Sequence, residues 1–298
     1  MIDPAPAVRL AWLRVVIGAY ALVYTLVRLP AWFGVLRYRP TQFHPVGPIT
    51  LLDQPWPDAV VVGLVFATVA LGVAFCLGWR FRWTGPGFAA AFMILLSYRN
   101  SWGMIFHTEN LMVFHVLVLG LGRSADAVSL DARVRRTGDE PEVHWRYGWP
   151  IRLMCAVTVL VYLLAGIAKL KHAGLAWVTS DALLNFVAYD NVRKLELGAG
   201  HAWLGGFLLT YDELFPPLAA LSLGIELGAP LALLHPRIAR VWVILIWSFH
   251  VGVLLVMYIF FHYPLLGFAF LPFFAIEEAV DRMRAWIAAR RSASVRVA

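Results

Sequence analysis

The chain has 298 residues, of which 61% are hydrophobic and only 14% are charged, with a net charge of +7. Ordinary soluble domains contain roughly 45–50% apolar and 25% charged residues, so this composition excludes a single water-soluble globule. The basic residues lie between apolar blocks rather than in one patch, which argues against nucleic-acid binding and indicates the lipid bilayer as the main partner.

Eight apolar blocks are candidates for membrane-spanning helices, because a span needs about 20 mostly apolar residues to cross a hydrocarbon layer of about 30 Å. They cover residues 10–27, 58–79, 85–98, 102–121, 150–170, 214–234, 238–261 and 264–276. The third and eighth blocks are short, so full crossing by these two stays open. The sequence therefore predicts an all-α, polytopic transmembrane helix bundle of about eight spans, built as one domain over residues 1–298.

The positions of Lys and Arg predict the topology. With a cytoplasmic N-terminus and eight spans, sixteen basic residues fall on the cytoplasmic side and eight on the other, with Arg14 inside the first span. Because positive residues are retained on the cytoplasmic side, both termini are expected there. The compact form without soluble appendages suggests a bacterial inner membrane.

Two long connections fall on the extracytoplasmic side in this topology. Residues 28–57 are rich in proline and aromatic side chains, which suits a segment lying in the membrane interface. Residues 171–213 include an amphipathic pattern that begins after Asp181, typical of an N-capped helix. The predicted fold thus includes interfacial helices on this side. The basic amphipathic tail, residues 278–298, is expected to rest on the inner leaflet.

Ionisable residues lie inside the apolar blocks, in the outer half to the middle of the predicted membrane. An ionisable group near the bilayer centre costs about 2.5–3.5 kcal/mol, so it usually faces the bundle interior and has a partner. Their similar depth predicts one shared polar site on the extracytoplasmic side. The residues assigned to it are His107, Glu109, Lys169, Glu226 and His250.

The fourth block carries three of the polar residues. A continuous helix places His107 and His115 about 80° apart, on one flank, and turns Glu109 about 200° away from His107. His115 also fits a helix-packing role through a hydrogen bond. Glu109 also fits a structural partner for Arg99 or Lys169.

Three residues of the fifth block share one stripe. Spacings of four and three align Tyr162, Gly166 and Lys169, and Gly166 leaves room beside the ammonium group. Lys169 also fits a lysine that extends to the outer headgroups. Glu226 and His250 lie near the midplane of the sixth and seventh blocks, where a purely structural role is the alternative. No HxxxH or HExxH spacing is present, so no metal site is expected.

Several segments resemble the HTTM family of membrane domains, whose best-known member is the vitamin K-dependent γ-glutamyl carboxylase. The matching segments in chain order are His107 with Ser129-Leu130-Asp131, Ala165-Gly166-Ile167-Ala168-Lys169-Leu170 with Trp177, Ile225-Glu226-Leu227, and Phe249-His250. They resemble the family's histidine-bearing helix with its Ser-x-Asp turn, its Ala-Gly-x-x-Lys-Leu…Trp signature, its helix with an acidic residue, and its Phe-His helix. The resemblance covers nearly the whole chain.

The resemblance implies carboxylase- or epoxidase-like chemistry at Lys169, the position of the base that deprotonates vitamin K hydroquinone before its oxygenation. His107 occupies, by the same resemblance, the place of a functional histidine that can hydrogen-bond the quinol. A lysine in a low-dielectric site can be neutral and accept a proton near neutral pH. A quinone or hydroquinone is thus the implied cofactor, with Tyr162, Gly166 and Trp177 beside it.

The chain also departs from the carboxylase. The carboxylase has a large luminal portion that binds its propeptide and glutamate-rich substrate, whereas this chain stops at Ala298, and Ala168 stands where the carboxylase has a second lysine. γ-Carboxylation of a protein substrate is therefore not expected. Three functions stay open: an enzyme acting on a quinone or other lipid-soluble molecule with Lys169 as base, a non-enzymatic scaffold for a separately encoded protein partner, and a small proton-coupled transporter using Glu226 and His250.

Overall fold

A computed structural model describes residues 3–103, 105, 107–134 and 143–295. This part of the chain is almost entirely helical, with one antiparallel pair of two-residue strands, β1 (Ala5–Pro6) and β2 (Val143–His144). The all-α prediction is therefore confirmed. The chain divides into two compact units, of which unit 1 comprises residues 1–154 and 274–298 and unit 2 comprises residues 155–273.

Four helices in the described residues are long and apolar enough to cross a bilayer. They are α1 (Ala7–Val27), α3 (Asp58–Leu77), α7 (Trp145–Ala173) and α12 (Pro236–Met257). The most apolar part of each has a mean hydropathy between 1.8 and 2.7. These helices match the first, second, fifth and seventh predicted spans, so the chain has the helices of a membrane protein.

The other four predicted spans are shorter or differently built. They correspond to α4 (Phe81–Asn100), α5 (Asn110–Leu121), α11 (Phe215–Leu227), and α13 (His262–Leu265) with the 3₁₀ helix Phe268–Phe273. α4 has the length of a span, but its first turns carry Arg82 and Pro86. α5 has 12 residues, about 18 Å of rise, which is too short to cross the hydrocarbon layer alone. Eight full crossings stay a prediction.

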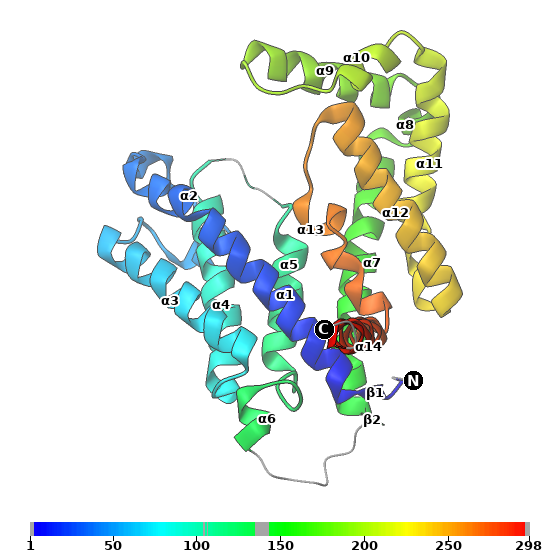
Figure 1. The fold of residues 1–298 in the computed structure, drawn as a ribbon. Coiled ribbons are helices and arrows are strands. Elements are labelled where there is room, and N and C mark those ends of the chain that lie inside the picture. The colour runs from blue at the N-terminus through cyan, green and yellow to red at the C-terminus, as the bar shows by residue number, and fades with distance from the viewer. Residues whose placement is uncertain (1–2, 104, 106, 135–142, 296–298) are drawn as a thin grey trace. The chain divides into compact units, whose positions relative to one another are not determined.

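Unit 1 is a bundle in which α1, α3, α4 and α5 lie side by side (Figure 1). Its other helices are α2 (Leu29–Gly34), α6 (Leu130–Val134) and α14 (Ile276–Val295), with 3₁₀ helices at Val35–Arg37, Pro40–Gln42 and Gly47–Leu51. Two glycines bring α4 and α5 together: a Cβ on Gly120 would lie only 2.6 Å from the carbonyl oxygen of Gly85. Small residues at such a crossing let two helix backbones approach closely.

A buried arginine joins three parts of unit 1. The guanidinium group of Arg14 is fully buried and donates to the carbonyl oxygens of Ser124 at 2.9 Å, Val128 at 2.5 Å and Cys76 at 3.4 Å. These bonds attach α1 to the end of α3 and to the connection after α5. We call Arg14 and these three carbonyl groups the Arg14 cluster.

The Ser-x-Asp turn lies next to this cluster and has a clear structural role. The carboxylate of Asp131 accepts hydrogen bonds from the backbone amides of Arg80 at 2.8 Å and Phe81 at 2.7 Å. The first amides of a helix have no carbonyl partner within the helix, and a carboxylate is a favourable cap for them. Gly78, whose φ of +61° suits glycine, makes the turn between α3 and α4 and accepts a bond from the Asp131 amide.

Residues 28–57 fold over the ends of α3 and α4 through aromatic contacts. The Trp56 ring stacks on Tyr98 with a centroid distance of 5.1 Å, and the Phe43 ring lies 5.0 Å from that of Trp102. Val35, Ile49 and Val61 complete this core. The segment is therefore packed against its own unit, and its predicted place in the membrane interface stays a prediction.

The predicted C-terminal helix is present as α14. It begins at Ile276. The carboxylate of Glu277 in its first turn forms a 2.7 Å ion pair with the guanidinium group of Arg9 in α1. This pair fixes the start of the tail to the first span. Contact of α14 with the inner leaflet stays a prediction.

In unit 2, the second part of α7 runs beside α11 and α12, and shorter helices lie across one end of these three (Figure 1). The shorter helices are α8 (Ala176–Thr179), α9 (Ala182–Glu196) and α10 (Trp203–Leu208), with a 3₁₀ helix at Asp212–Leu214. Another 3₁₀ helix, Ala229–Leu233, connects α11 to α12 at the opposite end. The helix predicted after Asp181 is thus confirmed as α9. The side chain of Asp181, however, makes no capping hydrogen bond, although its carbonyl accepts the amide of Asn185 at 2.8 Å.

Candidate functional site

The stripe on α7 faces α11 and α12, as the helical spacing predicts. Tyr162 is buried, Gly166 lies one turn further on, and Lys169 follows on the same side. A Cβ on Gly166 would lie 3.1 Å from the Cβ of Glu226 and 3.0 Å from the side chain of Leu227. The absence of a side chain at Gly166 therefore allows α11 to approach α7 at this level.

Lys169 and Glu226 form an ion pair at this approach. The Lys169 ammonium donates to both carboxylate oxygens of Glu226, with 2.5 Å to Oε2. The Glu226 side chain is 3% exposed and the Lys169 side chain 21% exposed. A buried carboxylate is costly unless it is paired, so the position of Glu226 depends on Lys169. Lys169 therefore points toward Glu226 within unit 2, and its contact with the outer headgroups stays a prediction.

Trp177 of α8 forms the third member of this group. Its ring centroid lies 5.4 Å from the Lys169 ammonium nitrogen, within the range of a cation–π interaction. The ring is buried against Ala219 and Leu223 of α11. Its indole nitrogen is buried and has no hydrogen-bond partner among the described residues. The Ala-Gly-x-x-Lys-Leu…Trp signature thus converges on one ion pair with an unused hydrogen-bond donor beside it.

His250 pairs with Tyr162 on the same stripe. The Tyr162 hydroxyl oxygen lies 2.8 Å from Nε2 of His250, and both residues are buried. Aromatic rings surround them, with Trp242 centred 5.5 Å from Tyr162 and Phe261 centred 5.2 Å from His250. The other ring nitrogen of His250, Nδ1, is buried without a partner among the residues that the structure describes. α7 therefore contributes one member to each of two side-chain pairs, Tyr162–His250 and Lys169–Glu226, which lie two helical turns apart and contain groups that can exchange protons.

The polar residues of the fourth block belong to unit 1, and the helix predicted there is wrong at its start. α5 begins at Asn110, so His107 and Glu109 precede it, and the predicted 80° and 200° relations do not apply. Gly103, with a φ of +128°, lies in the turn region before α5, a conformation that no α-helix contains. His107 is exposed, and its carbonyl accepts the amide of Asn110 at 3.2 Å.

Glu109 and His115 have separate partners in unit 1. Glu109 is 8% exposed and accepts hydrogen bonds from the hydroxyls of Tyr24 at 2.8 Å and Thr108 at 2.6 Å. His115 is fully buried, with Nε2 3.3 Å from the carbonyl oxygen of Met154. This contact agrees with the helix-packing role that was one of the two interpretations of His115.

A small pocket lies beside Glu109 in unit 1. Its volume is about 20 Å³, room for about one water molecule. It is lined by Tyr24, Arg28, Ala31, Trp32, Leu96, Arg99, Asn100 and Glu109. Arg99 is thus near Glu109, as one of the sequence-based alternatives proposed. Arg28 and Tyr24 were not singled out from the sequence, because an arginine and a tyrosine at the end of an apolar span are typical of the membrane interface.

The predicted site residues therefore fall into three groups. Unit 2 brings Gly166, Lys169, Trp177 and Glu226 together, and it joins Tyr162 to His250. Unit 1 holds the group around Glu109. The approach of His107 to Lys169 stays a prediction.

Comparison with known proteins gives one result that bears on identity. The model of the HTTM domain matches residues 3–278, nearly the whole chain. No curated protein and no solved structure matches the chain. The match extends over the Lys169 signature, the Ser-x-Asp turn and the helices that carry Glu226 and His250, so the resemblance inferred from these motifs is confirmed. The chain belongs to the HTTM family.

Proposed function

We propose that this HTTM-family membrane protein binds a quinone or other lipid-soluble molecule at the Lys169–Glu226 pair and moves a proton to or from it, with Lys169 as the base. The observation that carries the proposal is a lysine and a glutamate paired inside an apolar helical unit, next to the unpaired indole nitrogen of Trp177. Ionisable residues of membrane segments mark substrate or proton pathways by default.

The ion pair defines how Lys169 would act. While its proton is bound, the ammonium group cannot accept another. Transfer of that proton to Glu226 leaves a neutral amine beside a neutral acid, a state that is easier to reach in low-dielectric surroundings than in water. The amine of Lys169 then takes the proton of a hydroquinone hydroxyl, and the resulting ammonium group stabilises the hydroquinone anion. Glu226 thus serves as the proton store for Lys169.

The surroundings suit a flat, apolar ligand with oxygen atoms at its edge. Aromatic and aliphatic side chains line the pair, with Trp177, Ala219 and Leu223 on one side. The Trp177 indole can donate to a ligand carbonyl. Such sites, mostly apolar with a few placed polar groups, are typical of small-molecule binding.

The test is ligand retention and proton transfer in the purified full chain. Lipid-soluble molecules that copurify with the wild type, Lys169→Met and Lys171→Met proteins are identified by mass spectrometry. A short-chain benzohydroquinone is then titrated into each protein without oxygen, and its anion is followed by absorbance. Lys171 is the matched control because it is an exposed lysine two residues away. We expect the wild type and Lys171→Met to bind the hydroquinone and to form its anion. Lys169→Met should form no anion, whether or not it still binds the hydroquinone.

Two outcomes would overturn the proposal. If the wild type neither retains nor binds a quinone, the substrate class is wrong. If Lys169→Met forms the hydroquinone anion as the wild type does, Lys169 is not the base. Folding of each variant is checked by its elution on size-exclusion chromatography in detergent.

Proton-coupled transport is the second candidate, favoured by the Tyr162–His250 pair. These groups lie two turns along α7 from the Lys169–Glu226 pair, and Nδ1 of His250 is unpaired among the described residues. In vesicles with an imposed pH gradient, a transporter would show flux that Glu226→Gln abolishes. A scaffold for a protein partner would show neither flux nor quinone binding.

A further inference from the structure

Helix α9 has polar residues on its buried side and large apolar residues on its exposed side. Asp190 and Asn191 are only 9% and 5% exposed, whereas Tyr189 and Val192 on the opposite side are 70% and 52% exposed. A surface helix in water places its apolar side against the protein and its polar side outward. These four residues of α9 are placed the opposite way, although the outer side also carries the exposed polar residues Asn185 and Glu196. The outer side of α9 is therefore predominantly aromatic and aliphatic, with two polar side chains among them.

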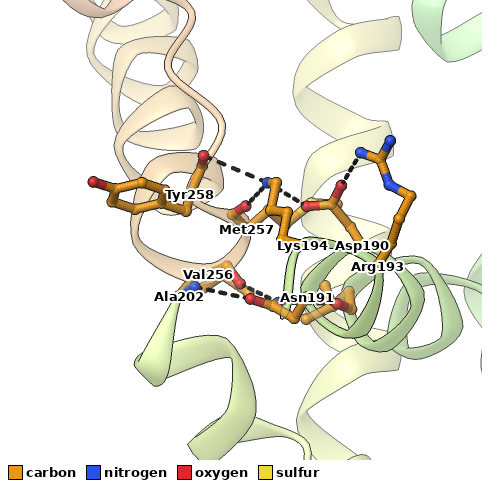
Figure 2. Close-up of polar contacts among 9 residues, drawn as sticks. Asp190, Asn191, Arg193, Lys194, Ala202, Val256, Met257 and Tyr258 are labelled. Atoms are coloured by element: carbon orange, nitrogen blue, oxygen red, sulfur yellow. Dashed lines mark hydrogen bonds and ion pairs between the residues drawn. The ribbon is translucent and has the colours of Figure 1, made fainter. Parts of the chain in front are cut away.

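The polar face of α9 binds the end of α12 (Figure 2). The ammonium group of Lys194 donates to the carbonyl oxygens of Met257 and, at 3.5 Å, Tyr258, and it pairs with Asp190 at 2.5 Å. Arg193 reaches the other carboxylate oxygen of Asp190 at 3.0 Å. The last carbonyls of a helix have no partner within the helix, and a lysine near them is favourable. α9 therefore supplies the C-terminal cap of α12.

Asn191 makes the second connection and includes α10 in it. Its side-chain amide donates to the carbonyl of Val256 at 3.0 Å, and its oxygen accepts the backbone amide of Ala202 at 2.9 Å (Figure 2). Gly205 permits this arrangement, because a Cβ there would lie 2.8 Å from the Asn191 side-chain nitrogen and closer still to the Val256 carbonyl. α9 and α10 are thus fixed to the same turn of α12.

The position of this turn gives the depth of α9 and α10 in the membrane. α12 has 22 residues, about 33 Å of rise, which matches the hydrocarbon thickness of about 30 Å. Its last turn, Val256 and Met257, therefore lies where the span leaves the hydrocarbon. Figure 1 shows α9 and α10 running across the ends of α7 and α12 rather than along them. We therefore expect helices in this place to lie in the headgroup region.

The outward side of α9, α10 and their connection is rich in apolar and aromatic side chains. They are Phe186 at 57% exposure, Tyr189 at 70%, Val192 at 52%, Leu195 at 53%, Leu197 at 71%, Trp203 at 77% and Phe207 at 53%. Leu164 on α7 and Ile244 on α12, residues of the spans themselves, have similar exposures of 53% and 63%. Tryptophan and tyrosine are enriched where protein meets the membrane interface.

We propose that these seven side chains form a lipid anchor, a surface by which α9 and α10 insert into the headgroup and upper acyl region of the bilayer at the end of α12. The occupant is lipid because this surface lies at the end of apolar helices whose own apolar residues are exposed to the same extent, and because Asn191 and Lys194 on the other side of α9 are bonded to α12. Lys194 and Asn191 are positioning residues, since they hold the anchor at the level of the span end.

The test measures which medium the anchor contacts. The full chain, with Cys76→Ser and Cys155→Ala, receives one spin label at Tyr189→Cys, Val192→Cys or Trp203→Cys and is reconstituted in phospholipid vesicles. The ratio of collision rates with oxygen and with a water-soluble nickel chelate is measured for each. The label at Ile244→Cys on α12 serves as the lipid reference, and the label at exposed Arg133→Cys on α6 serves as the water reference. We expect ratios at the three anchor positions close to Ile244→Cys and several-fold above Arg133→Cys.

A second measurement leaves both native cysteines in place. Quenching of tryptophan fluorescence by phospholipids brominated near the headgroup is compared between wild type and Trp203→Phe, and the difference is the contribution of Trp203. Strong quenching of that contribution supports the anchor. Labels with the nickel exposure of Arg133→Cys, or no lipid quenching of Trp203, would overturn it. Labels shielded from both reagents would assign the surface to a protein partner instead.

A pair of variants tests the positioning role. Lys194→Met removes the bonds to the end of α12, and we expect the label at Val192→Cys to move toward the water reference. Arg193→Met is the matched control, because Arg193 is 41% exposed and contacts Asp190 rather than α12. Equal shifts in the two variants would contradict the positioning role of Lys194.

Discussion

Two polar clusters, one in each unit, are held by different kinds of partner. In unit 1, Arg14 bonds to three backbone carbonyls and Asp131 to two backbone amides. In unit 2, Lys169 bonds to Glu226, and His250 bonds to Tyr162. Backbone groups do not titrate, whereas these four side chains of unit 2 all have groups that can gain or lose a proton.

This difference separates structure from chemistry in a membrane protein. A charge held by carbonyls at three points of the chain joins segments and has no proton to exchange with its partners. A charge held by another ionisable side chain can be neutralised by a short proton shift within the pair. We therefore expect the Arg14 cluster to determine whether unit 1 folds, and the Lys169–Glu226 pair to determine what unit 2 can do.

The largest expected effect is on folding, from Arg14→Leu. It leaves three carbonyl groups of the Arg14 cluster without their donor, at about 1–3 kcal/mol for each buried group that stays unsatisfied. For three such groups together we expect the free energy of unfolding to fall by about 3–9 kcal/mol, measured by titrating SDS into the protein in mild detergent. Arg9→Leu on the same helix is the control, because its ion pair with Glu277 is partly exposed. Equal losses in the two variants would contradict the special role of the Arg14 cluster.

An intermediate effect is expected from breaking the unit 2 ion pair. Glu226→Leu leaves Lys169 without its partner, and removing one member of a buried pair costs about 3–5 kcal/mol. The double variant Lys169→Met with Glu226→Leu removes both charges and should recover most of that stability while losing quinone-dependent chemistry. If the double variant is as unstable as the two single changes combined, the pair contributes mainly to folding, and unit 2 resembles unit 1.

The sequence alone predicted the parts of this molecule that depend on local spacing. The spans α1, α3, α7 and α12 follow from long apolar runs, and the stripe of Tyr162, Gly166 and Lys169 follows from helical periodicity. The place of His107 was predicted wrongly, because a helix was extended back through Gly103, whose positive φ excludes it. An apolar run shows where a chain avoids water but not where a helix begins.

Contacts between distant segments were beyond the sequence. Arg14 interrupts the first apolar run, but its carbonyl partners come from residues more than 60 positions away, so no local pattern identifies them. The reversed amphipathicity of α9 was missed for another reason. Periodicity identifies two faces of a helix, and only the contacts of Lys194 and Asn191 with α12 show which one faces protein.

The smallest expected effect comes from Tyr162→Phe, which removes one hydroxyl and keeps the aromatic packing with Trp242. His250 then loses its 2.8 Å partner at Nε2 and has neither ring nitrogen bonded among the described residues, at a cost of about 1 kcal/mol for a single neutral hydrogen bond. SDS titration should resolve this loss, with Tyr189→Phe on the exposed side of α9 as the unchanged control. Because the Tyr162–His250 pair differs from the Arg14 cluster in carrying exchangeable protons, Tyr162→Phe should alter proton-dependent activity more than stability. A stability loss as large as that of Arg14→Leu, with activity per folded molecule unchanged, would place this pair with the structural charges of unit 1.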